Sequence, residues 1–210
     1  MPTTAQPVYQ YSLLTADAQN ALVGDGILSG QIATFNGALI PQLEDRVAQL
    51  TGRASALAVD SGSSALRMAM RGLEIRAGQE VIIPEIGWVS VGAAADMLGA
   101  AVRVAPATDS LTPTLKEIEP LIGPDTAAVV LVHLRGRPAP GTAEIATRLR
   151  ERGIPLIEDC AQAWGVDVGG RPVGAWGTLV LLRGSSWRGV GVGQAGVCRR
   201  TGCSAEVCTG

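Results

Sequence analysis

From about residue 41 onward, short apolar runs typical of strands alternate with longer segments that have the periodicity of helices. The run 127–132 is apolar without interruption, as expected of a strand that is buried on both faces. Because a helical segment separates each run from the next, the strands can lie parallel, with helices crossing over between them. The sequence therefore predicts an α/β fold with a mostly parallel sheet flanked by helices on both faces.

The expected elements can be placed along the chain. The predicted helices cover 42–51, 65–73, 89–98 and 143–152, and the predicted strands cover 56–59, 80–83, 101–104, 127–132 and 154–157. A short helix is expected after Thr112 as N-cap, with Pro113 as its first residue and Glu117 in its first turn. Thr142 is expected to cap the helix over 143–152.

Composition excludes several classes of protein. The chain has 47% hydrophobic and 17% charged residues, which is typical of a folded domain. Its 17 basic and 19 acidic residues are spread out, so no basic patch indicates nucleic acid or an anionic membrane as a partner. No apolar run approaches the ~18 residues of a membrane span, and residues 1–25 lack the basic start of a signal peptide. We expect a cytoplasmic protein.

The four cysteines are unevenly placed, with Cys160 alone in the body of the chain and Cys198, Cys203 and Cys208 near its end. An even number permits disulfides, but nothing else in the sequence indicates secretion. A structural zinc site takes four ligands in closely spaced pairs, and the single histidine, His133, lies far from the three cysteines in sequence. We interpret the three as free thiols in a poorly ordered tail, and we expect no metal.

Three features lie where a strand leads into a helix or a loop. Residues 61–64 are Ser-Gly-Ser-Ser, which fits either a phosphate-binding helix start or a plain helix cap. Asp159 follows a buried strand, where a carboxylate is costly unless a cation or a donor partners it, although it also fits a capped loop acid. Trp88 fits either a surface for stacking a flat ring or a core side chain. Ligands collect at such strand ends.

The order of these motifs resembles the DegT/DnrJ/StrS family of sugar and cyclitol aminotransferases, which are fold type I enzymes dependent on pyridoxal 5'-phosphate (PLP). The likeness covers about residues 26–180. It rests on LSG at 28–30, VDSGSSAL at 59–66, VIIP at 81–84 followed by Trp88, LGA at 98–100, VHLRG at 132–136, IEDCAQA at 157–163 and VG at 173–174.

The resemblance implies a role for five residues. Gly62 and Ser63 would hold the cofactor phosphate, Trp88 would stack on the pyridine ring, and Asp159 would pair with the ring nitrogen. Gln162 would reach the phenolic oxygen. An anionic Asp159 would keep the ring nitrogen protonated, which makes the ring an electron sink. The bound form would be PLP or its aminated form, PMP.

The sequence departs from the family at its most important position. In the family, a lysine forms the Schiff base about eleven residues after a glycine equivalent to Gly177 and five before a glycine-rich turn equivalent to Gly193. Both counts lead to Arg188. Arginine stays protonated, so it can neither condense with an aldehyde nor accept a proton. The only lysine, Lys116, falls in a helix that we expect to be exposed between two strands. We therefore expect Arg188 to be inactive and any cofactor binding to be non-covalent.

Two further departures accompany Arg188. Arg183 stands where the family usually has a phosphate-binding serine, and Gly87 replaces the hydroxyl residue usual before the tryptophan. His133 matches a family histidine, and we interpret it as a structural residue at a strand end.

The second half of such enzymes, which includes the small C-terminal domain, has no counterpart here. We divide the chain into an N-terminal arm (1–25), a PLP-binding large-domain core (26–180) and a tail rich in Gly, Arg and Cys (181–210).

A different class of protein has to be weighed. Residues 191–196 have the glycine spacing of a dinucleotide-binding loop, and 179–182 fits its preceding strand. That motif needs a helix directly after the loop and an acidic residue about twenty positions later. The sequence offers neither, so we do not favour a dinucleotide enzyme.

Two interpretations of function stay open. In the first, the chain is an aminotransferase-type protein that acts on a keto-sugar or keto-cyclitol with an amino acid donor, with its own catalysis in question because of Arg188. In the second, it is a non-catalytic homologue or partner subunit that binds PLP, PMP or a homologous chain. Because the family's site is completed by a neighbouring chain, the resemblance implies a homodimer or a homologous partner in either case.

Overall fold

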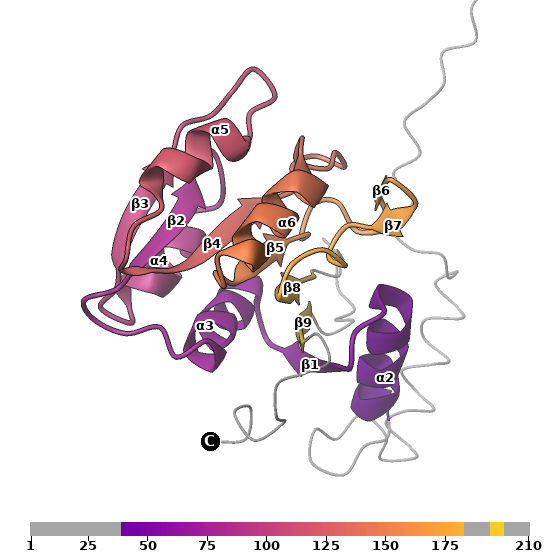
Figure 1. Cartoon of the computed structure of the whole chain (residues 1–210). Helices are drawn as coiled ribbons and strands as arrows, with labels where there is room; N and C mark the ends of the chain where they lie inside the picture. The colour runs from indigo at the N-terminus through magenta and orange to yellow at the C-terminus, as the bar shows by residue number, and fades with distance from the viewer. Residues whose placement is uncertain (1–38, 183–193, 200–210) are drawn as a thin grey trace, which may run out of the picture.

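The computed structural model describes residues 39–182 and 194–199, and Figure 1 shows how its elements are arranged. In chain order the elements are α2 (Leu39–Thr51), β1 (Ser55–Val59), α3 (Gly62–Gly72), β2 (Glu80–Pro84), α4 (Ser90–Asp96), β3 (Ala101–Ala105), α5 (Leu115–Ile118), the 3-10 helix η1 (Glu119–Leu121), β4 (Thr126–Val132), α6 (Thr142–Glu151), β5 (Leu156–Asp159), β6 (Asp167–Val168), β7 (Arg171–Pro172), β8 (Leu179–Leu181) and β9 (Gln194–Arg199).

One seven-stranded sheet forms the centre of the described chain, in the order β1-β9-β8-β5-β4-β2-β3. The five neighbouring strands from β8 to β3 are parallel, and β9 is antiparallel to both β1 and β8. A separate antiparallel pair, β6 and β7, lies outside this sheet. The predicted α/β fold with a mostly parallel sheet is confirmed.

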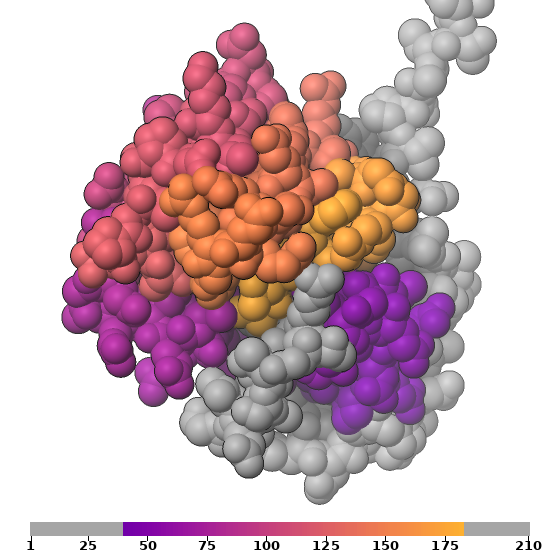
Figure 2. All heavy atoms as spheres, in the orientation of Figure 1, coloured from indigo at the N-terminus to yellow at the C-terminus, as the bar shows by residue number. Residues whose placement is uncertain are grey.

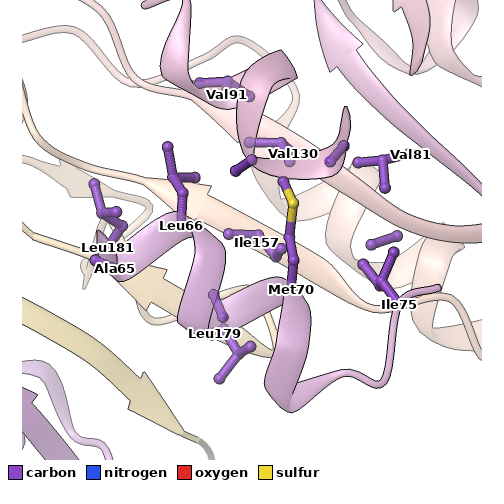
Figure 3. Close-up of a cluster of buried hydrophobic side chains, with 14 of the residues drawn as sticks. Ala65, Leu66, Met70, Ile75, Val81, Val91, Val130, Ile157, Leu179 and Leu181 are labelled. Carbon is purple, nitrogen blue, oxygen red and sulfur yellow. The ribbon is translucent and has the colours of Figure 1, made fainter. Parts of the chain in front are cut away.

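Helices cover both faces of the sheet, and alternation along each strand divides the core between them. On one face, α3 and α4 pack on a cluster that includes Val130 and Ile157. Figure 3 shows Leu66 and Met70 of α3 pointing toward these strand residues. On the other face, α5 and α6 cover a second cluster. In Figure 2, the orange residues around α6 form the centre of this side of the molecule, and α2 (indigo) lies beside them.

Ile157 and Asp159 of β5 therefore face α3 and α4, whereas Leu156 and Glu158 face the opposite side. A third cluster packs α2 against β8 through Val47 and Val180. Two consecutive acidic residues of one strand thus serve opposite faces of the sheet.

The helix starts differ from the predictions in three places. The helix predicted over 65–73 begins three residues earlier, at Gly62, so that the 61–64 motif forms its first turn with Ser61 as the N-cap. Thr112 is buried and caps nothing. The N-cap of α5 is instead Thr114, in a capping box with Glu117 whose Oε2 accepts the N–H of Thr114 at 2.9 Å.

The start of α6 is the third difference. Thr142 is the first residue of the helix, and Gly141 is its N-cap, with a left-handed φ of 71°. The Thr142 hydroxyl donates to the carbonyl of Ala139 at 2.6 Å, so it closes the preceding turn and does not cap the helix.

None of the helices in the described part of the chain is long and apolar enough to cross a membrane. The strand β9 falls within the segment 181–210 that we interpreted as a tail, where no strand was predicted. Cys203 and Cys208 lie outside the described residues.

Candidate functional site

The carboxyl ends of several strands meet at one pocket of about 160 Å³. Its lining comes from the loop after β1, the start of α3, the loop after β2, the start of α4 and the ends of β5 and β8. The lining residues are Ser61, Gly62, Ser63, Leu66, Trp88, Ser90, Asp159, Ala161 and Leu181. Four of the five predicted cofactor residues, Gly62, Ser63, Trp88 and Asp159, are thus brought together from segments almost one hundred residues apart.

The start of α3 supplies backbone donors to this pocket. The Ser61 hydroxyl accepts the N–H of Ser64 at 3.1 Å, and the Ser61 carbonyl accepts the N–H of Ala65 at 3.0 Å. Gly62 and Ser63 are the first two residues of the helix, so their N–H groups have no acceptor within it. A methyl group added at Gly62 would meet no atom within 4 Å, so open space lies next to these donors. This is the geometry of an anion site at a helix N-terminus.

Asp159 ends β5 with its side chain on the α3 face of the sheet. Only 6% of the residue is exposed, although it lines the pocket. Two hydrogen bonds hold Asp159 in place. The N–H of His133 donates to its backbone carbonyl at 3.0 Å, and the N–H of Ala161 donates to its side-chain Oδ1 at 3.0 Å. A largely buried carboxylate at a pocket wall can accept a hydrogen bond from a cationic N–H donor of a bound molecule.

Trp88 lies at the mouth of the pocket and leaves 69% of its surface exposed. Trp88 lies in the loop between β2 and α4. Because most of its surface is exposed, it belongs to the surface and not to the core. Of the two interpretations that the sequence left open for Trp88, the core side chain is therefore wrong. An exposed indole at a pocket mouth can stack on a flat ring.

The remaining predicted residues are placed differently. Gln162 is exposed and does not line the pocket, and its Oε1 accepts the backbone N–H of Arg135 at 3.2 Å. Arg188 and Arg183 lie outside the described residues. Lys116 is exposed on α5, which packs on the face of the sheet opposite to α3.

The sequence analysis missed the role of Glu158, the neighbour of Asp159 on β5. Glu158 is fully buried, and its carboxylate accepts hydrogen bonds from the N–H groups of Gly174, Trp176 and Gly177. Arg53 is buried beside it, with 3.7 Å between Nη2 and Oε1. These partners are 16 to 105 positions away in sequence. The only local signal for the network was an acidic residue directly after the apolar run of the predicted strand 154–157.

His133 completes this network at the end of β4, as the structural residue that we expected. Its Nδ1 accepts the N–H of Ala139 at 3.0 Å, so the proton of the neutral ring is on Nε2. Nε2 lies 3.2 Å from Oε2 of Glu158 and donates to it.

The environment of Glu158 sets its ionisation. Burial raises the pKa of Glu158, but the hydrogen bonds from His133 and from the N–H groups of Gly177 and Gly174 lower it by more. Because the net pKa is below the ordinary glutamate value, ionised Glu158 stabilises the fold above the ordinary glutamate range. This stabilisation is lost as the pH falls through the pKa of the folded state.

His133, Glu158 and Cys160 form the one group in the described part of the chain whose ligand atoms, all within 4.8 Å of one another, could hold a metal. Both oxygens of Glu158 already accept hydrogen bonds. Burial and the nearby Glu158 and Asp159 carboxylates raise the pKa of the Cys160 thiol well above its usual value, which disfavours the thiolate that a metal binds. We interpret His133 and Glu158 as members of a hydrogen-bonded network, with Cys160 as a buried free thiol beside them.

The dinucleotide interpretation meets a direct obstacle. Residues 194–199 form the strand β9, which pairs with β1 and β8. A dinucleotide-binding loop at 191–196 would need a helix at this place.

Comparison with known proteins agrees with the fold and identifies the family. The sequence pattern of the DegT/DnrJ/EryC1/StrS aminotransferase family matches residues 15–183. An aminotransferase from Psychrobacter cryohalolentis is 25% identical, with a TM-score of 0.82 over 93% of this chain and 49% of its own. The structure of 3-amino-5-hydroxybenzoic acid synthase is 26% identical, with a TM-score of 0.80 over 90% of this chain and 50% of its own.

A third similar structure is the PLP form of a protein from Streptococcus pneumoniae named as a sugar aminotransferase. It is 20% identical, with a TM-score of 0.79 over 90% of this chain and 52% of its own, and it supports the fold. The present chain thus spans about half the length of the solved structures that it matches. Since the family pattern covers most of the chain and the fold agrees, this chain belongs to the DegT/DnrJ/EryC1/StrS aminotransferase family.

Proposed function

We propose that this chain is a PLP-binding, aminotransferase-type protein for the amination of a keto-sugar or keto-cyclitol with an amino acid donor. One observation carries the proposal: the start of α3, the exposed ring of Trp88 and the buried carboxylate of Asp159 line the same pocket. An anion site, a stacking surface and an acceptor for a cationic N–H together match the phosphate, the ring and the ring nitrogen of PLP.

The residues present fit the cofactor. The open space at Gly62 beside the first N–H groups of α3 leaves room for a phosphate. When bound, PLP supplies the electron sink for amino-group transfer, and that chemistry belongs to the cofactor. The chain's own contributions are to hold the phosphate at Gly62 and Ser63, to orient the ring against Trp88, and to keep the ring nitrogen protonated through Asp159.

The assignment of Gln162 needs a specific orientation of its amide. Because Oε1 accepts the N–H of Arg135, the NH₂ group is the end of the amide that can donate to a phenolic oxygen. The contact with Arg135 is thus compatible with the role that the family resemblance implies for Gln162.

The second candidate function is a non-catalytic homologue or partner subunit. The observation that favours it is Arg188 at the position of the Schiff-base lysine. The first candidate binds PLP or PMP non-covalently in the pocket, and the second binds PLP, PMP or a homologous chain. They differ in whether this chain completes the reaction.

Removing the Asp159 charge should weaken PLP binding. We expect the unaltered chain to bind PLP without a covalent bond, and Asp159→Asn to bind it about 10- to 100-fold more weakly, because a hydrogen bond to a charged group contributes ~1.5–3 kcal/mol. Equilibrium dialysis with PLP measures both affinities. Asp167→Asn, which changes an exposed acid on β6, is the matched control and should leave the affinity unchanged. Equal affinities for all three chains would contradict the proposed role of the pocket.

We also propose that the chain associates with a second copy or with a homologous chain. Large apolar side chains around α4 and the edge strand β3 are exposed, with Val89 at 80%, Met97 at 65% and Val104 at 49%. Exposed apolar surface of this kind is typical of an interaction site.

Sedimentation equilibrium tests this association. We expect the unaltered chain to sediment with more than the mass of one chain, and the pair of substitutions Met97→Glu and Val104→Glu to shift it toward a monomer. Leu50→Glu, at an exposed position near the end of α2, is the control and should not shift the mass. A monomer at every concentration, with no homologous chain bound, would contradict the proposal.

A further inference from the structure

Residues 174–177, which we call the 174–177 turn, are held by side chains from elsewhere in the fold. The N–H groups of Gly174 and Trp176 each donate to the Glu158 carboxylate at 2.8 Å, and the N–H of Gly177 also donates to it. One buried carboxylate thus takes up three backbone donors of this turn.

Arg53 holds the same turn by its carbonyl groups. Nη1 of Arg53 donates to the Gly177 carbonyl at 2.9 Å, and Nη2 donates to the Gly174 carbonyl. Both the N–H and the C=O of Gly174 and of Gly177 are therefore bound by a pair of opposite charges that also contact each other. The donors and acceptors of the turn determine where it sits relative to β5.

The turn leads directly into β8. The N–H of Thr178 donates to the Leu156 carbonyl at 2.7 Å, and β8 then pairs with β5 so that Leu181 lies opposite Asp159. Leu181 and Asp159 both line the pocket. A shift of the turn would therefore slide β8 along β5 and move Leu181 relative to Asp159 in the pocket wall.

Stability alone does not explain a buried network of this kind. Taking an arginine and a glutamate out of water costs free energy that their attraction often fails to exceed, and apolar side chains of similar size can give equal or greater stability. The charged pair instead fixes the position of the turn, because each of its hydrogen bonds holds one backbone N–H or C=O group in a defined place. Glu158 precedes Asp159 on β5 and points to the opposite face, so its contacts hold the backbone that carries Asp159.

We propose that Glu158, supported by Arg53 and His133, is a positioning residue that fixes Asp159 and β8 at the pocket. This inference rests on the proposed function insofar as Asp159 serves a bound cofactor. The positioning itself concerns residues of this chain alone, and it can be measured without a cofactor.

Amide hydrogen exchange tests the positioning. Glu158→Gln keeps the size of the side chain but places an NH₂ donor against backbone N–H groups. We expect the amides of Ala161 and Cys160 to exchange at least about tenfold faster, relative to the Val129 amide in β4, because the end of β5 opens locally. These two amides report on Asp159 and β8, since they donate to Asp159 Oδ1 and to the Leu181 carbonyl.

A matched control separates positioning from loss of stability. Ile118→Ala removes a buried side chain of α5 on the same face of the sheet but away from β5, so it should speed exchange of all three amides alike. If Glu158→Gln does not fold, Arg53→Lys takes its place, because it keeps the charge and loses the two-carbonyl contact. Equal exchange ratios in the network variant and in Ile118→Ala would overturn the inference.

Dialysis with PLP distinguishes this inference from the proposed function. If the unaltered chain binds PLP, Glu158→Gln should bind it about tenfold or more weakly, whereas Ile118→Ala should keep its affinity under conditions where both are folded. An unchanged affinity in Glu158→Gln would overturn the inference. If the unaltered chain does not bind PLP, the proposed function fails, and the exchange ratios still decide whether Glu158 positions Asp159.

Discussion

Arg188→Lys is expected to make this chain attach PLP covalently, whereas the unaltered chain should attach none. The lysine amine can lose its proton and condense with an aldehyde, and the arginine guanidinium cannot. Arg188 lies outside the described residues, so the prediction rests on two counts in the sequence, eleven residues from Gly177 and five to Gly193. Borohydride reduction followed by mass spectrometry of the intact chain measures the attachment.

Two controls make the outcome specific. Arg150→Lys adds a lysine at an exposed position of α6 and should remain unlabelled. Combining Arg188→Lys with Asp159→Ala should abolish the labelling, because the pocket would lose the carboxylate that we propose pairs with the ring nitrogen. Labelling of the unaltered chain would point to Lys116, and no labelling of Arg188→Lys would mean that the site cannot be completed from this chain.

The part of the site that could be predicted lies at strand ends. In a parallel sheet with crossover helices, the carboxyl ends of the strands lie at one edge, so a motif that follows a strand is placed there by topology alone. This rule alone places Gly62, Trp88 and Asp159 near one another, and all three line one pocket. The family resemblance then gave each of them a role that remains a prediction.

The part that could not be predicted depends on contacts between distant residues. Nothing in the sequence pairs Glu158 with Arg53 or with the backbone of residues 174–177, because backbone N–H and C=O groups have no sequence signature. The prediction of where α5 begins was wrong for a local reason. Thr112 with Pro113 and Thr114 with Glu117 both fit known helix starts, and the reciprocal bonds of the capping box favoured the second.

Gly177→Ala is expected to destabilise the fold by about 3–5 kcal/mol, since overpacking and the loss of a buried charge's partners both contribute. A methyl group at this position would lie 2.6 Å from the Leu156 carbonyl oxygen and 3.2 Å from Oε1 of Glu158. The first neighbour is backbone of β5 and cannot rotate away. The turn would have to move, and its N–H groups would leave the buried carboxylate.

Gly72→Ala is the matched control for this substitution. It lies at the end of α3, where an added methyl group would meet no atom within 4 Å, so its effect should stay within about 1 kcal/mol. Urea unfolding followed by circular dichroism gives both free energies of unfolding. If Gly177→Ala unfolds at the same urea concentration as Gly72→Ala, the turn can move without loss. The Glu158 carboxylate would then not be what holds β8 against β5.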